Sequence, residues 1–157
     1  MTIRPYNKHI DAQQLRRCVI GLQEFERQLD PRMPSGESIA DNYIQEMFMQ
    51  CRQFAGVVFV CEQGDKIAGY ITIHTKYVSE DINDGPRKFA FISDVFVDEE
   101  FRGQGIGKAL LNHAEIHARE NDVSEMMIGV LASNNQARSL YLAMGFEEFA
   151  IKLEKKL

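Results

Sequence analysis

The sequence has few cysteines and histidines, and they do not cluster. Cys18, Cys51 and Cys61 are odd in number and widely spaced, so they form no CxxC pair. His113 and His117 are four residues apart, but no carboxylate or third histidine lies at a recognised ligand spacing. The sequence therefore predicts no metal centre and favours three partly buried thiols in a reducing compartment.

Long apolar runs and basic clusters are also missing. No apolar stretch is long enough to span a bilayer, and the N-terminal stretch Met1–Asp11 lacks the apolar core of a signal peptide. The net charge is −5, and no basic patch favours binding to nucleic acid. We therefore expect a cytoplasmic protein with no membrane or nucleic-acid partner. The acidic balance weakly favours cationic small molecules.

What remains is the composition of an ordinary globular chain, with 45% hydrophobic and 26% charged residues. No internal repeat, low-complexity tract or linker divides it. We therefore expect a single domain over residues 1–157. The sequence leaves both a monomer and a homodimer open.

Hydrophobic periodicity predicts the order β-α-α-β-β-β-α-β-α-β, an α/β (α+β) arrangement with a mixed sheet and helices on its two faces. The crossover between the strands 88–97 and 126–132 makes that pair parallel. The last strand rests on the alternation of Phe149, Ile151 and Leu153. This last strand is expected at 147–157, and the other strands are expected at 2–6, 57–62 and 67–78. The helices are expected at 11–29, 39–51, 105–121 and 134–144.

The stretch FRGQGIGKALL, Phe101–Leu111, places three glycines between an apolar strand and a helix. It is not a dinucleotide fingerprint, because Lys108 stands where the third glycine should be, and it is not a P-loop, because Arg102 and Ala109 occupy required positions. Free N–H groups at a helix start nevertheless favour an anion, and glycines leave room for it to approach. The alternative is a turn that only allows close helix–strand packing. We favour the anion site.

Two segments resemble the signatures of the GNAT family of N-acetyltransferases. The first is R-x-x-G-x-G within DVFVDEEFRGQGIGKALL, and the second is N-x-x-A-x-x-L-Y-x-x-x-G-F within ASNNQARSLYLAMGF. The element order is similar to the family fold over essentially the whole chain. The signature positions are Arg102, Gly105, Gly107, Asn134, Ala137, Leu140, Tyr141, Gly145 and Phe146.

The resemblance implies that acetyl-CoA lies in a V-shaped gap between the strands that hold Val97 and Val130. Strand backbone would pair with the pantetheine arm, helix N–H groups would hold the pyrophosphate, and Asn134 would bond the pantetheine or diphosphate region. Tyr141 would lie near the thioester sulfur. The implied cofactor-binding residues are Val95, Phe96, Val97, Arg102, Gly103, Gln104, Gly105, Ile106, Gly107, Lys108, Asn134 and Tyr141.

Amide formation from a thioester needs a neutral amine and a protonated leaving thiolate. An alkyl ammonium has a pKa of about 10, so a base or desolvation must remove its proton. Tyr141 is a plausible acid for the thiolate, and a core aromatic is its alternative role. Tyr141 and Asp94 are thus the candidate catalytic residues.

The sequence offers several candidates for the general base. Asp94 is a carboxylate within the apolar strand AFISDVFV and could be a base, an amine anchor or a structural partner. Some relatives carry a glutamate where this chain has Gly129. Ser93, Glu62 and a water chain are alternatives.

The resemblance implies an acetyl-CoA-dependent N-acetyltransferase that acts on a primary amine of a small molecule or peptide. The segments 30–38 and 79–87 would surround the acceptor. An acyl-CoA-binding regulatory module without catalysis is the competing hypothesis, and a nucleotide-binding protein fails on both fingerprints.

Overall fold

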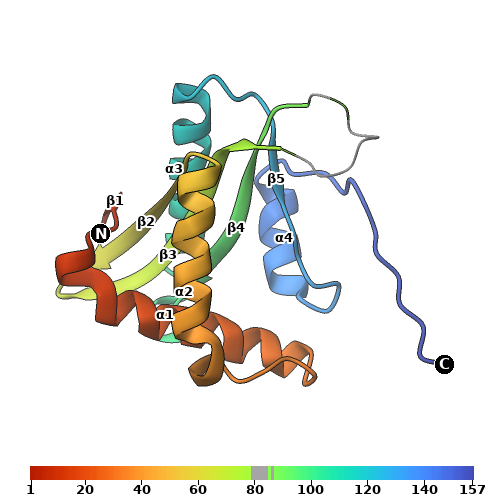
Figure 1. Cartoon of the computed structure of the whole chain (residues 1–157), viewed down its shortest axis with the longest axis horizontal. Helices are drawn as coiled ribbons and strands as arrows, with labels where there is room; N and C mark the ends of the chain where they lie inside the picture. The colour runs from red at the N-terminus through yellow and green to blue at the C-terminus, as the bar shows by residue number, and fades with distance from the viewer. Residues whose placement is uncertain (79–84, 86) are drawn as a thin grey trace.

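The computed structural model of the chain describes residues 1–78, 85 and 87–157 (Figure 1). Its element order confirms the α/β class and the predicted sequence of elements up to the last helix. The elements are β1 (Thr2–Pro5), α1 (Lys8–Leu29), α2 (Gly36–Gln53), β2 (Gly56–Gln63), β3 (Lys66–Tyr77), β4 (Phe89–Val97), the 3-10 turn η2 (Glu99–Phe101), α3 (Ile106–Glu120), β5 (Met126–Ile128) and α4 (Asn135–Ala143). None of these described helices is long and apolar enough to cross a membrane.

The strands form one mixed sheet in the order β1-β2-β3-β4-β5. The pairs from β1 to β4 are antiparallel, whereas β4 and β5 are parallel. The parallel pairing covers only Ala90–Ile92 against Met126–Ile128. The predicted crossover is therefore confirmed, but the strand expected at 126–132 ends at Ile128, and no other part of the described chain pairs with the rest of β4 on that side.

Helices cover both faces of the sheet. α1 and α2 pack on one face around Leu15, Val60 and Tyr70, while α3 and α4 pack on the other around Ile71 and Leu110. Tyr70 and Ile71 are neighbours in β3, and successive side chains of a strand point to opposite faces. Both are fully buried, which is why β3 reads as a continuous apolar run.

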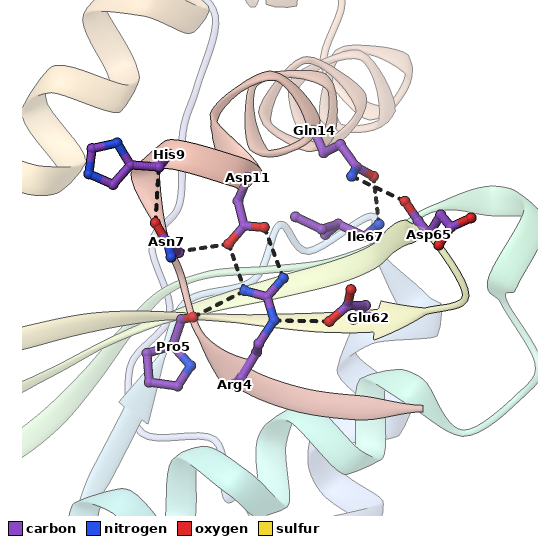
Figure 2. A network of polar contacts seen from close by, with 9 residues as sticks. All are labelled: Arg4, Pro5, Asn7, His9, Asp11, Gln14, Glu62, Asp65 and Ile67. Carbon is purple, nitrogen blue, oxygen red and sulfur yellow. Dashed lines mark hydrogen bonds and ion pairs between the residues drawn. The ribbon is translucent and has the colours of Figure 1, made fainter.

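A polar network joins the N-terminus to the sheet (Figure 2). Arg4 donates two hydrogen bonds to Asp11, at 2.7 and 2.9 Å, and a third to Glu62 at 2.9 Å. Asp11 also accepts from the backbone N–H of Asn7. Asn7 caps α1 by accepting from His9 N, so the helix begins at Lys8 and not at the predicted Asp11.

The predicted last strand is wrong. Residues beyond α4 form no strand with any described part of the chain, and in Figure 1 they run away from the sheet. Phe149, Ile151 and Leu153 are 66%, 76% and 92% exposed. An alternating pattern forms a strand only where an edge and a covering layer are within reach. Here ion pairs hold the segment instead, between Arg138 and Glu148 and between Arg32 and Glu154.

Candidate active site

A cavity of about 330 Å³ lies where β4 and β5 separate. Beyond Ile92, residues 93–97 of β4 pair, among the residues that the structure describes, with β3 on one side only. Their outer edge therefore offers backbone N–H and C=O groups to whatever enters. The walls of the cavity come from the end of β4, the glycine loop with the start of α3, residues 128–131, α4, and one face of α1.

The glycine loop forms the floor of one end. Gly103 and Gly105 have φ of 76° and 80°, a left-handed backbone that glycine adopts without strain. Gly105 is the N-cap of α3 and provides no side-chain cap for the first N–H groups of the helix, and residues 105–108 line the cavity. A Cβ on either glycine would meet nothing within 4 Å. This open, uncapped helix end fits an anion such as a phosphate group.

The two basic residues of the loop, Arg102 and Lys108, make different contacts. Lys108 lines the cavity, as does Arg102. However, Arg102 Nε donates to the carbonyl oxygen of Val97 at 3.1 Å, and the guanidinium lies 5.0 Å from the ring of Phe25. Arg102 is therefore held against β4 and α1. Gln104 is the one predicted cofactor residue that does not line the cavity, since its side chain bonds Gln63.

The second signature borders the opposite wall. Asn134 caps α4, with its side-chain oxygen accepting from Ala137 N at 3.1 Å, so its amide NH₂ remains to donate to a ligand. Tyr141 lies in the last turn of the same helix and is only 8% exposed. Burial, and secondly the charge of Glu26, raise the pKa of Tyr141 to about 12. Its phenol is therefore protonated at neutral pH.

Asp94 also lines the cavity and is 3% exposed. Its carboxylate accepts hydrogen bonds from Tyr43 at 2.5 Å, from Ser93 at 2.7 Å and from Tyr70 at 3.4 Å. The partners of this buried carboxylate are thus hydroxyl groups on three elements. Burial raises the pKa of Tyr43 and Tyr70, so both remain donors.

Other titratable residues lie outside the cavity. Glu62 pairs with Arg4 at the N-terminal network, outside the cavity. His74 is fully buried and contacts Ser93, at 3.2 Å, without lining the cavity. His113 and His117 pack edge-on against the ring of Phe59. Among the described residues no group of three or more His, Cys, Asp or Glu could hold a metal. The acidic loop 79–87 falls largely outside the described residues.

Glu26 is the site residue that the sequence reasoning missed. It comes from α1, one turn after Leu22, and lines the same cavity as Asp94 and Tyr141. Burial, and then the charge of Asp94, raise the pKa of its carboxyl. The signal was present, because Leu22 and Phe25 belong to the apolar face of α1 and a glutamate at the fourth position shares that face.

An open strand edge beside an uncapped, glycine-rich helix start brings backbone hydrogen-bonding groups and an anion site into one cavity. The sequence model of the acetyltransferase (GNAT) family matches residues 22–146. The chain belongs to this family. The curated relatives are N-acetyltransferases, and the chain spans 38% and 54% of the lengths of the first two, uncharacterized N-acetyltransferases of Methanocaldococcus jannaschii and Bacillus subtilis.

The identity to the M. jannaschii protein is 38% over 92 residues, or 57% of this chain. Thialysine N-epsilon-acetyltransferase of Bos taurus is 27% identical over 90% of this chain and 81% of its own length. Ribosomal protein bS18-alanine N-acetyltransferase of Escherichia coli is 30% identical over 60% of this chain and 64% of its own length.

Solved structures support the fold. A Bacillus halodurans protein superimposes with a TM-score of 0.85 at 22% identity, covering 100% of this chain and 99% of that one. A Pyrococcus horikoshii protein gives 0.77 at 24% identity, covering 96% and 91%. At these identities the likeness concerns the fold alone.

Proposed function

We propose that the chain is an N-acetyltransferase that moves an acetyl group from acetyl-CoA to a primary amine of a small molecule or peptide. The amine attacks the thioester directly in a ternary complex. One observation carries this proposal: a single cavity joins the uncapped start of α3, the open edge of β4, a protonated Tyr141 and the buried carboxylate of Asp94. The cavity therefore combines groups suited to bind the donor with groups suited to the chemistry.

For the donor, the N–H groups from Gly103 to Lys108 would hold the pyrophosphate, with the amide of Asn134 as a further donor. Backbone groups of residues 95–97 would pair with the pantetheine arm along the open edge of β4. Bound in this way, acetyl-CoA supplies an acetyl thioester, a reactive acyl group with a thiolate leaving group. The strand fixes where its carbonyl lies, and such positioning lowers the barrier.

For the leaving group, Tyr141 would donate its phenolic proton to the thiolate sulfur. Burial keeps this phenol protonated across the physiological range, which an acid requires. For the acceptor, Asp94 would order the hydroxyls of Tyr43 and Ser93 around the amine-binding end. The acidic character of this end suits an ammonium ion.

The names of the relatives and the charge of the site suggest which amines to test as acceptors. Those names include a small molecule, thialysine, and the alanine of a ribosomal protein, so both kinds of amine are candidates. We further propose a single domain over residues 1–157 in the cytoplasm. The free, buried thiols of Cys18, Cys51 and Cys61 agree with a reducing compartment.

The competing function is an acyl-CoA-binding regulatory module. Gly129 favours it mildly, because a carboxylate is missing there although a Cβ would have open space. An amine screen that follows free CoA separates the two, with thialysine and a peptide beginning with alanine as first acceptors. Acetyl-CoA binding by calorimetry, compared with ATP and NAD, tests the donor. Tight acetyl-CoA binding without CoA release on any amine would favour the module, and no acetyl-CoA binding would reject both.

A further inference from the structure

The cavity contains two carboxylates among the described residues that line it, Asp94 and Glu26. Their situations differ. Asp94 is almost completely buried and accepts from three hydroxyl groups. Three of the about four acceptor sites of this carboxylate are therefore already used by neighbouring hydroxyl groups.

Glu26 is the free carboxylate of the pair. No hydrogen-bond donor among the described residues is directed at its side chain, and it is half-buried. Without donors, burial disfavours the charged form, so the pKa of Glu26 is raised and its carboxylate is more basic than usual. A perturbed carboxyl inside a cavity is a common mark of a proton-transfer group.

Glu26 lines the same cavity as Asp94 and Tyr141. Its charge contributes to raising the pKa of Tyr43 on α2 and of Tyr141 on α4. Its own carboxyl is affected by the charge of Asp94 on β4. The charged groups that line the cavity from other elements are Arg102 and Lys108. Glu26 thus lies within electrostatic reach of both the acceptor end and the phenol.

We propose that Glu26 is the general base that removes the proton from the acceptor amine. This assignment rests on the proposed N-acetyltransferase function. Glu26 accepts one proton from the ammonium ion and releases it to solvent, to which its side chain is partly exposed. Asp94 is then a positioning residue, which holds the hydroxyls that surround the amine.

The protons balance over the reaction. The neutral amine nitrogen forms a bond to the acyl carbon, and the C–S bond breaks. The thiolate takes the phenolic proton of Tyr141. The nitrogen then loses its second proton through Glu26, which returns it to the phenolate of Tyr141. The net products are an amide, a thiol and one released proton, and both side chains are restored.

The test is Glu26→Gln, which keeps the shape and removes the base. We expect the acetyl-CoA Kd to stay within a few-fold and kcat/KM for the amine to fall by about 10²-fold or more at pH 7. The defect should shrink toward pH 10, where an alkyl amine becomes neutral by itself. It should also be smaller at pH 8 for a peptide α-amine, of pKa about 7.7–8.0, than for an alkyl amine near 10.4.

Two variants serve as controls. Glu26→Asp keeps a carboxylate and should recover part of the lost rate. Glu120→Gln removes a similar charge from the exposed end of α3 and should behave as the wild type. An active wild type with a full-speed Glu26→Gln variant, or a defect that is independent of pH, overturns the assignment of Glu26 alone. A wild type that acetylates no amine overturns the proposed function and the base with it.

Discussion

The phenol of Tyr43 on α2 donates a 2.5 Å hydrogen bond to the carboxylate of Asp94 on β4. This bond joins a helix of one layer to the sheet at the part of the cavity where we propose that the amine binds. Because Ser93 and Tyr70 donate to the same carboxylate, the position of three hydroxyls depends on one charge. The role of Asp94 can therefore be tested separately from donor binding.

Asp94→Asn keeps the shape of the side chain but replaces an acceptor by an NH₂ group that faces hydroxyl donors. We expect acetyl-CoA affinity within a few-fold of wild type and a large fall in kcat/KM for the amine, measured by CoA release and calorimetry. Thr72→Val is the matched control, because Thr72 pairs with Asp94 across β3 and β4 and its buried hydroxyl has no partner among the described residues. An unchanged rate would remove Asp94 from the site, and a variant that does not fold would show a structural role.

Gly105→Val tests the anion end of the cavity. A branched side chain there projects into the open space at the start of α3, where the pyrophosphate should lie. We expect loss of acetyl-CoA binding by calorimetry with the fold retained. The left-handed backbone adds strain of about 1–2 kcal/mol.

Gly64→Val controls for that strain. Gly64 also has a left-handed backbone, with φ of 61°, and a Cβ there would meet nothing within 4 Å, but it lies in the turn between β2 and β3. It should lose similar stability and keep donor binding. Equal binding by Gly105→Val and the wild type would show that the loop is not the phosphate site.

Asp11→Asn tests the network of Figure 2. The Asp11 side chain is 2% exposed and accepts two hydrogen bonds from Arg4, which hold its pKa below the usual value. Removing a charged partner of a buried hydrogen bond typically costs about 1–3 kcal/mol, so we expect a loss of unfolding free energy in that range in urea at pH 7. Glu62→Gln, at the exposed end of the same arginine, should lose less than about 1 kcal/mol.

The pH dependence of this stability loss tests whether the charge of Asp11 causes it. A carboxyl with a depressed folded pKa stabilises the fold above its unfolded pKa of about 3.9 and loses this effect as the pH falls through the folded value. The difference between wild type and Asp11→Asn should therefore be full at pH 7 and shrink below about pH 4. A difference that stays constant down to pH 2 would exclude ionisation of Asp11 as its source.

Most of the fold was predictable because its helices and strands have their own hydrophobic period. The failures came from tertiary context. Phe149, Ile151 and Leu153 alternate like a strand, but they find no partner edge, and the start of α1 depends on the cap formed by Asn7. In the same way Glu26 lies on the apolar face of a helix and Asp94 lies in an apolar strand. Only three-dimensional neighbours show that Asp94 has three hydroxyl donors, whereas Glu26 has none among the described residues.

Tyr141→Phe tests the acid. The change deletes one hydroxyl and nearly preserves packing against Phe146, so stability should change little. General acid catalysis is typically worth about 10²–10⁴-fold, and we expect kcat to fall in that range with acetyl-CoA binding little changed. Because the pKa of Tyr141 is raised to about 12, the size of the defect should be constant between pH 7 and pH 10. It should shrink with an acyl donor whose thiol is more acidic, since that leaving group needs less protonation. Tyr77→Phe is the control, because Tyr77 packs against Phe89 at the far end of β3, outside the cavity. A Tyr141→Phe variant at full speed on acetyl-CoA, with chemistry shown to be rate-limiting, would leave Tyr141 as a packing residue.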